Sequence, residues 1–143
     1  MKLPDPQSTA SAGAMLASSL QAGDVVTLSG PLGAGKTSFV RGLLQALGHE
    51  GEVPSPSFAI VQPYEHLDPP VFHVDLYRIE DARELEQLAL DELDDAVLVV
   101  EWPEKAGGWD HALALTIAMD EPTGGRRLTA DVPAAWKQRC PFP

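Results

Sequence analysis

The residues of this chain best suited to chemistry form one glycine-rich loop at positions 30–37, with the sequence GPLGAGKT. The loop fits the phosphate-binding pattern G-x-x-x-x-G-K-[ST] at every fixed position. Glycine lets the backbone curl so that several N–H groups meet phosphate oxygens at close range. Lys36 is predicted to reach the β and γ phosphates, and the Thr37 hydroxyl to ligate the Mg²⁺ that bridges them. The loop therefore predicts a nucleoside triphosphate site.

The segments on either side of the loop are those that such a site requires. Residues 24–29 form an apolar run containing β-branched residues, which predicts a strand, and residues 37–47 carry apolar side chains at helical spacing. This order aims the first N–H groups of the helix, and the positive end of its dipole, at the phosphates. It favours a nucleotide site over a glycine-rich turn that binds nothing.

Two carboxylates follow short apolar runs farther along the chain. Asp75 ends the run at 71–75 and Glu101 ends the run at 96–101. Ligands of parallel sheets bind beyond the carboxyl ends of the strands, where the loop also lies. We expect at least one of these carboxylates to serve the metal, although either alone is also typical of a helix cap or turn. His73 is predicted to be packed and hydrogen-bonded, not a metal ligand.

The remaining segments predict the frame of an α/β domain. Residues 1–7 form an N-terminal arm or a short edge strand, and a helix follows with Ser8 as its N-cap and Gly23 as its stop. Further predicted elements are an edge strand at 59–64, a helix at 81–88, an antiparallel hairpin of 113–119 with 126–132, and a half-helix at 134–139. The tail at 133–143 is expected to end loosely. The prediction is one P-loop NTPase-like domain over 1–143, with a mixed β-sheet flanked by helices and a C-terminal antiparallel hairpin.

Three features leave alternatives open. The proline-rich segment 53–58 is either a connector or a switch-like loop that brings Ser55 or Ser57 near the metal. Trp102 is either a lid over the core or a surface for a partner or a base. Arg126 and its neighbour Arg127 are surface charges by default, with a nucleotide contact as the alternative.

The composition excludes several classes of protein. Ten basic and twenty-one acidic residues give a formal charge of −11, which leaves no broad basic surface for gripping nucleic acid directly. Cys140 is the one cysteine and cannot form an internal disulfide. No leader and no long apolar run occurs, so a cytoplasmic protein without membrane contact is expected.

Several blocks together resemble one family. These blocks are LSGPLGAGKT, PSPSF, FHVDLYR, ELE with its following leucines, and VVEWPE, and they span about residues 8–128. In this order and spacing they are similar to the TsaE (YjeE) family of bacterial ATPases. The pairing of DLYR with EWP is far more specific than the loop, which many folds share.

The resemblance implies an ATPase that binds ATP and Mg²⁺ and assists the TsaB–TsaD heterodimer in threonylcarbamoyladenosine modification of tRNA. It implies that tRNA is reached only through these partners, and that the chain does not itself transfer the threonylcarbamoyl group. The motif positions place the metal ligands at Thr37 and Glu101, the functionally needed aspartate at Asp75 and the switch hydroxyl at Ser57. The expected nucleotide contacts are Gly33, Ala34, Gly35, Lys36, Thr37, Ser38 and Ser57, with Asp5 and Gly125 from the arm and the hairpin.

The predicted catalytic residues are Lys36, Asp75 and Glu101. Family members commonly carry an acidic residue where this chain has Pro31, and threonine where it has Ser57. The sequence places no obvious arginine finger, so hydrolysis is expected to be slow without a partner. The alternatives are a small-molecule P-loop kinase, which would need an acceptor pocket and a basic lid, and a nucleotide-gated binding module that does not hydrolyse.

Overall fold

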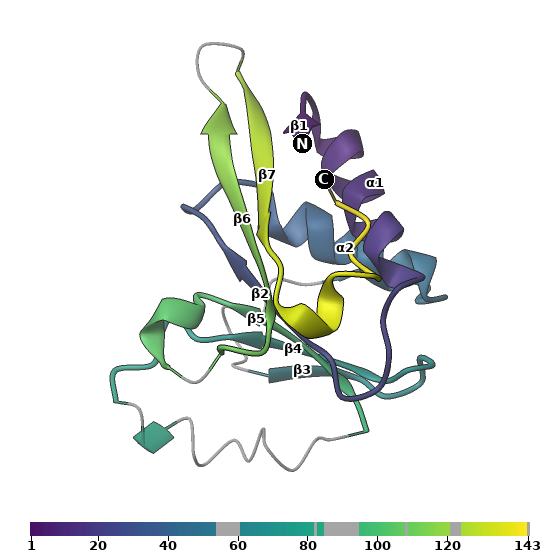
Figure 1. Ribbon diagram of the computed structural model, residues 1–143, viewed down its shortest axis with the longest axis vertical. Coiled ribbons are helices and arrows are strands. Elements are labelled where there is room, and N and C mark those ends of the chain that lie inside the picture. Colours follow the sequence, from purple (N-terminus) through teal and green to yellow (C-terminus); the bar gives the residue numbers. More distant parts are fainter. Residues whose placement is uncertain (54–60, 82, 85–94, 108, 121–123, 143) are drawn as a thin grey trace.

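The computed structural model describes residues 1–53, 61–81, 83–84, 95–107, 109–120 and 124–142. Within these ranges seven strands form one sheet in the order β1-β7-β6-β2-β5-β4-β3 (Figure 1). The strands are β1 (Lys2–Leu3), β2 (Val25–Ser29), β3 (Val61–Tyr64), β4 (Val71–Asp75), β5 (Val97–Glu101), β6 (Leu113–Asp120) and β7 (Gly125–Asp131). The helices are α1 (Pro6–Ala17), α2 (Lys36–Ala46) and the short 3₁₀ helices η3 (Pro103–Lys105) and η4 (Ala134–Trp136).

The sheet is mixed, with a parallel centre. Strands β6, β2, β5 and β4 run parallel, while β7 and β3 pair antiparallel on either side of them. The apolar runs at the centre are buried on both faces, as is usual for parallel strands. The predicted mixed sheet and C-terminal hairpin are both confirmed. The register sets Asp75 of β4 opposite Glu101 of β5, and Glu101 opposite Leu28 of β2.

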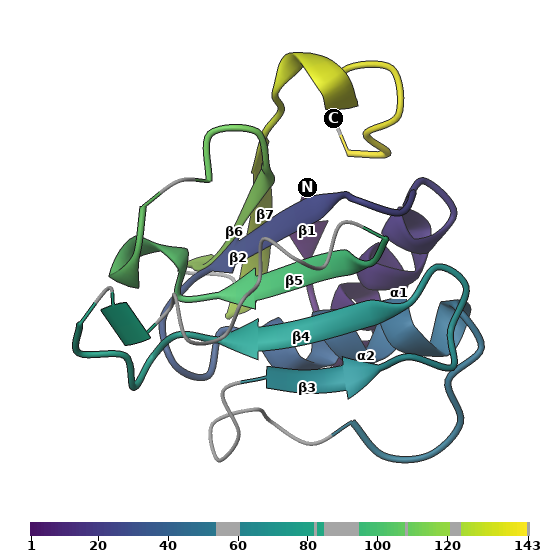
Figure 2. The same ribbon diagram turned by 90° about the horizontal axis from the view of Figure 1, so that it is seen from below.

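Helices α1 and α2 lie together on one face of the sheet (Figures 1 and 2). They cross closely because each has a glycine at the contact, Gly13 in α1 and Gly42 in α2. A Cβ at Gly42 would lie 1.9 Å from the Ala10 carbonyl oxygen, and one at Gly13 would lie 2.0 Å from the Phe39 carbonyl oxygen.

Helices α1 and α2 are short, with 12 and 11 residues. No helix in the described part of the chain is long and apolar enough to cross a membrane.

The C-terminal tail packs on the core, so the expected loose end is wrong for residues 141–142, and residue 143 lies outside the described residues. Trp136 is buried, and the centres of the Phe142 and Phe39 rings lie 6.3 Å apart. Arg139 forms two hydrogen bonds with the carboxylate of Asp24, at 2.8 and 3.0 Å, and stacks over Trp136. Apolar burial and a bidentate ion pair hold this segment.

The N-terminus also differs from its prediction. The N-cap of α1 is Asp5 and not Ser8. Ser8 is the third residue of the helix and forms a capping box with Asp5, in which each side chain accepts a hydrogen bond from the backbone N–H of the other residue. Pro6 begins the helix because proline fits its first turn. Residues 2–3 form an edge strand against β7. The predicted start of the strand at 59–60 and most of the helix at 81–88 lie outside the described residues.

The close crossing of α1 and α2 allows a prediction about stability. We expect Gly42→Ala to lower the free energy of unfolding by about 3 kcal/mol, because the added methyl group meets rigid backbone of α1. Urea unfolding followed by circular dichroism measures this change. Gly107→Ala is the matched control, since Gly107 is exposed and nothing lies within 4 Å of its added Cβ. Equal stability of the two variants would contradict the described packing.

Candidate functional site

The phosphate-binding loop joins the end of β2 to the start of α2. Gly35 is the N-cap of α2 and has a left-handed backbone, with φ of 103°, so any other residue there would be strained. Gly30 passes so close to β6 that a Cβ would lie 2.3 Å from the Ile117 carbonyl oxygen. These two glycines let the loop turn sharply beside the sheet and aim the N-terminus of α2 outward.

A cavity of about 430 Å³ lies over the carboxyl ends of the central strands. Lys36, Thr37, Asp75 and Glu101 all line it. The side chains arrive from α2, β4 and β5, which the sheet register brings to one edge. The structure thus brings together the three predicted catalytic residues and both predicted metal ligands.

Lys36 makes two contacts within the protein. Its ammonium group donates a hydrogen bond to the Gly30 carbonyl and lies 3.9 Å from the centre of the Trp102 ring. Burial lowers the pKa of the Lys36 ammonium, while the negative charges of Glu101 and Asp75 act in the opposite direction. A cation over an aromatic face is stabilised by the ring's negative π surface. Trp102 itself has a left-handed backbone, with φ of 58°, which is rare for so large a residue.

Asp75 is a turn carboxylate as well as a cavity residue. Its Oδ1 accepts a hydrogen bond of 2.8 Å from the backbone N–H of Tyr77. Burial raises the pKa of the Asp75 carboxyl and the nearby Glu101 adds to this, whereas the hydrogen bond from Tyr77 opposes it. The turn interpretation of Asp75 is therefore confirmed, and its role toward a metal stays a prediction.

Glu101 is paired with a buried histidine. The Nε2 atom of His73 lies 2.6 Å from Oε2 of Glu101, and both residues are buried. The prediction that His73 is packed and hydrogen-bonded is confirmed. Its partner was not predicted, because this contact depends on how β4 and β5 align.

The oxygen atoms at this cavity fit Mg²⁺. The Thr37 hydroxyl and the carboxylates of Asp75 and Glu101 are hard oxygen donors of the kind that this ion prefers. Among the described residues, no group of three or more His, Cys, Asp or Glu side chains could hold a metal by itself. A magnesium ion at nucleotide sites completes its shell with phosphate oxygens and water, so a small protein donor set suffices.

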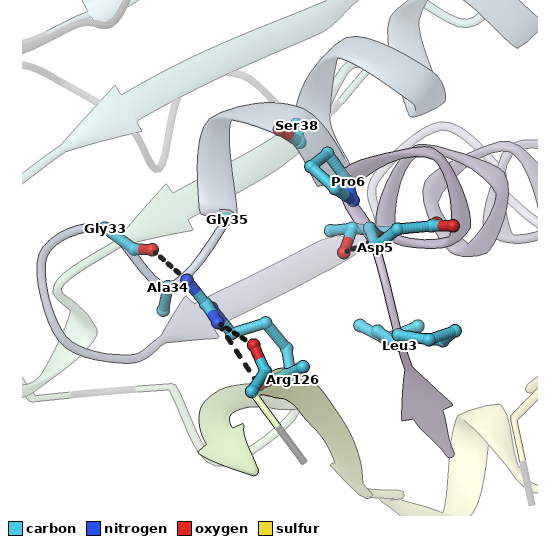
Figure 3. Close-up of a pocket in the computed structure, with 12 residues that line it drawn as sticks. Leu3, Asp5, Pro6, Gly33, Ala34, Gly35, Ser38 and Arg126 are labelled. Carbon is cyan, nitrogen blue, oxygen red and sulfur yellow. Dashed lines mark hydrogen bonds between the residues drawn. The ribbon is translucent and has the colours of Figure 1, made fainter. Parts of the chain in front are cut away.

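A second cavity of about 280 Å³ shares part of its lining with the first, and Figure 3 shows the residues that line it. Gly33, Gly35 and Ser38 line both cavities, which makes the loop the wall between them. Residues that line only the second cavity include Leu3, Pro4, Asp5, Thr9, Ala34, Gly125 and Arg126. The positions predicted for nucleotide contact from the arm and the hairpin, Asp5 and Gly125, are thus beside the loop. One oxygen of the Asp5 carboxylate accepts the Ser8 N–H at 2.7 Å.

Three residues lie beside the site: Arg126 and Trp102, for which the sequence left alternatives open, and Arg78, which it did not single out. Arg126 donates to the Gly33 carbonyl at 3.2 Å and so links β7 to the loop, as the dashed lines in Figure 3 show. Arg78 lines the first cavity, and Trp102 lies over Lys36. The DLYR and EWP blocks contain two of these residues, which is the signal that points to them. Ser55 and Ser57 lie outside the described residues.

The family model for the threonylcarbamoyl adenosine biosynthesis protein TsaE matches residues 3–128 of this chain. The chain belongs to the TsaE family. A TsaE relative from Streptomyces coelicolor is 51% identical over 96 residues, which are 64% of this chain and 65% of the relative. One from Mycobacterium tuberculosis is 45% identical over 112 residues, which are 71% of this chain and 67% of the relative.

A solved TsaE-like structure has the same fold. The crystal structure of Bacillus subtilis YdiB superposes with a TM-score of 0.79 at 28% identity and covers 98% of this chain and 89% of YdiB. The sequence matches are shorter: the chain spans 65% of the Streptomyces relative and 54% of a TsaE relative from Haemophilus influenzae that is 42% identical. The TsaE fold therefore extends beyond the segment in which these sequences align.

The burial of Asp75 makes a prediction about stability. Because its pKa is raised in the folded protein, the ionised carboxylate costs stability at neutral pH. Asp75→Asn removes the charge and keeps an oxygen acceptor for Tyr77, so we expect its melting temperature to rise by about 2–4 °C at pH 7. The gain in melting temperature should vanish near pH 3, where the Asp75 carboxyl is protonated in both the folded and the unfolded protein.

Differential scanning fluorimetry across this pH range measures the effect. Asp110→Asn, at an exposed position outside both cavities, is the matched control and should change the melting temperature little. A native-like or lower melting temperature for Asp75→Asn at pH 7 would show that burial of this charge is not costly.

Proposed function

We propose that this chain is a Mg²⁺-dependent ATPase that assists a TsaB–TsaD heterodimer in the threonylcarbamoyladenosine modification of tRNA. The observation that carries the hydrolytic part is one cavity lined by Lys36, Thr37, Asp75 and Glu101, at the N-terminus of α2. The modification pathway and the partner pair are supported by membership of the TsaE family.

ATP would span the two neighbouring cavities in one orientation. The triphosphate would occupy the cavity over the strand ends, where the loop amides and the N-terminus of α2 supply positive potential. The nucleoside would occupy the cavity between the loop, the N-terminal arm and the start of β7. Gly33, Gly35 and Ser38 line both cavities, so the chain of phosphates would pass directly over them. Adenine in preference to other bases is supported by the family alone.

Each predicted catalytic residue has a distinct task. On binding, Lys36 would exchange the Gly30 carbonyl and the Trp102 ring for the β and γ phosphates, and its charge would offset the charge that develops there. The chemistry that Mg²⁺ would supply there is positive charge beside the phosphates. Asp75, fixed by the Tyr77 N–H, would orient the attacking water. Thr37 and Glu101 would hold the metal.

The rim of the phosphate cavity supports action through a partner. Leu32 and Tyr77 are 69% and 43% exposed, and both line this cavity. Exposed apolar side chains around a polar cavity are typical of surfaces that another protein covers. A partner seated there would exclude water and complete the charge stabilisation, which is the reason to expect slow hydrolysis by the chain alone. The formal charge of −11 favours contact with tRNA through such partners.

The proposed function predicts the outcome of a phosphate-release assay. We expect Mg²⁺-dependent release from ATP below about 1 s⁻¹ by the chain alone, and a higher rate with purified TsaB–TsaD. Lys36→Ala and Glu101→Ala should each lower the stimulated rate by about 100-fold or more, because charge stabilisation or the metal is lost. Lys137→Ala is the matched control, since Lys137 is exposed and lines neither cavity.

The same assay separates the alternatives. Equal amounts of ADP and phosphate without any added acceptor support hydrolysis and contradict a small-molecule kinase. ATP binding without phosphate release in every mixture would leave a nucleotide-gated binding module. A partner-free rate near the enzyme median of about 10 s⁻¹ would contradict the dependence on a partner.

A further inference from the structure

A buried histidine stands next to the predicted metal ligand and has no part in the proposed chemistry. His73 alternates with Val71 and Asp75 on one face of β4, and Val99 and Glu101 share the corresponding face of β5. Val71 and Val99 belong to the same apolar cluster as residues of α1 and α2, so this face lies beneath the helices. An imidazole that is fully buried there costs stability unless it is hydrogen-bonded.

His73 forms its one side-chain hydrogen bond within the described part of the chain with Glu101. A separation of 2.6 Å between Nε2 of His73 and Oε2 of Glu101 is that of a hydrogen bond. Glu101 must be ionised to ligate a metal, and an ionised carboxylate only accepts, so in that state the ring nitrogen is the donor. Nδ1 has no hydrogen-bond partner among the described residues. A bare acceptor nitrogen is easier to leave unpaired in a buried place than an N–H group is. The Nε2 proton therefore has one destination, which is the Glu101 carboxylate.

We propose that His73 is a positioning residue that occupies one oxygen of Glu101 and leaves only Oε1 for a divalent cation, which biases the site toward Mg²⁺ and against Ca²⁺. This inference rests on the proposed function, because it assumes that ATP binds with a metal at Glu101. It adds a source of metal selectivity that lies outside the ligand set.

The selectivity follows from the different coordination of the two ions. Mg²⁺ demands octahedral geometry and takes one oxygen from a carboxylate, with waters and phosphates in the other positions. Ca²⁺ takes six to eight oxygen ligands and often binds a carboxylate through both of its oxygen atoms. Bidentate binding by Glu101 would put the cation on Oε2, where it competes with the His73 N–H for the electrons of that oxygen and weakens the hydrogen bond of a buried donor. That penalty applies to Ca²⁺ and not to Mg²⁺.

The test measures ATP binding by isothermal titration calorimetry in EDTA, in saturating Mg²⁺ and in saturating Ca²⁺. The metal preference is the Kd in Ca²⁺ divided by the Kd in Mg²⁺. We expect His73→Leu to lower this ratio by about 10-fold or more, the size usual for loss of a contact to a metal ligand. The Kd in EDTA should stay within about 2-fold of native, because the contacts of the loop with phosphate remain.

Two further variants separate positioning from general packing. His73→Gln places an amide N–H close to the position of Nε2, so it should restore the ratio to within about 3-fold of native. Val99→Ala removes a packed side chain beside His73, and it should lower the melting temperature while keeping the native ratio. If His73→Leu fails to fold, His73→Asn carries the test, since its amide is too short to reach Glu101.

The outcomes distinguish this inference from the proposed function. The positioning role alone would be overturned if folded His73→Leu or His73→Asn kept the native ratio of Kd in Ca²⁺ to Kd in Mg²⁺. It would also be overturned if the ratio of His73→Gln were as low as that of these two variants. Equal affinity of the native chain in Mg²⁺ and Ca²⁺ would overturn it too. If the native chain binds no ATP under any of the three conditions, the proposed function fails and this inference fails with it.

Discussion

Burial of opposite charges at one edge of a sheet is the constraint on which the rest of this structure depends. Lys36, Asp75 and Glu101 are 6%, 7% and 4% exposed, and they share one cavity. Charges taken out of water are costly unless they are paired or meet a ligand. In this protein each has a partner within the chain: the Gly30 carbonyl and Trp102 for the lysine, the Tyr77 N–H for Asp75 and His73 for Glu101. These contacts hold the three charges at one edge of the sheet, beside the phosphate-binding loop.

The fold supplies this arrangement through three simple features. Parallel pairing of β2, β5 and β4 puts the ends of these strands at one edge, so the loop and both carboxylates meet there. The close crossing of α1 and α2 at Gly13 and Gly42 fixes α2, whose first residue is Lys36. Strand β1 and the Asp5 cap bring the N-terminal arm beside the loop, where it forms a wall of the second cavity.

Local patterns were sufficient to predict the loop, the strands that end in Asp75 and Glu101, the hairpin and the mixed sheet. The loop, the strands and the hairpin each depend on residues that are close together in the sequence, and the continuous apolar runs are typical of the buried parallel strands at the centre of the sheet. The partner of His73 and the contact between Lys36 and Trp102 were not predictable, because they depend on strand register and on a left-handed backbone at a tryptophan. The cap of α1 was misplaced by three residues because Asp5 and Ser8 both fit a cap, and only the capping box assigns their roles. The tail was expected to be loose because its end is rich in proline. The contacts that hold it, between Phe142 and Phe39 and between Arg139 and Asp24, join residues far apart in the sequence.

The most direct test of the central claim is a crystal structure of this protein with a non-hydrolysable ATP analogue and Mg²⁺. The account predicts that the triphosphate lies along residues 33–38 and that the Lys36 ammonium leaves the Gly30 carbonyl and the Trp102 ring to contact the β and γ phosphates. It also predicts a metal held by the Thr37 hydroxyl and one oxygen of Glu101. A triphosphate bound elsewhere, or a Lys36 that keeps its contact with Gly30 while the analogue is bound, would contradict the account.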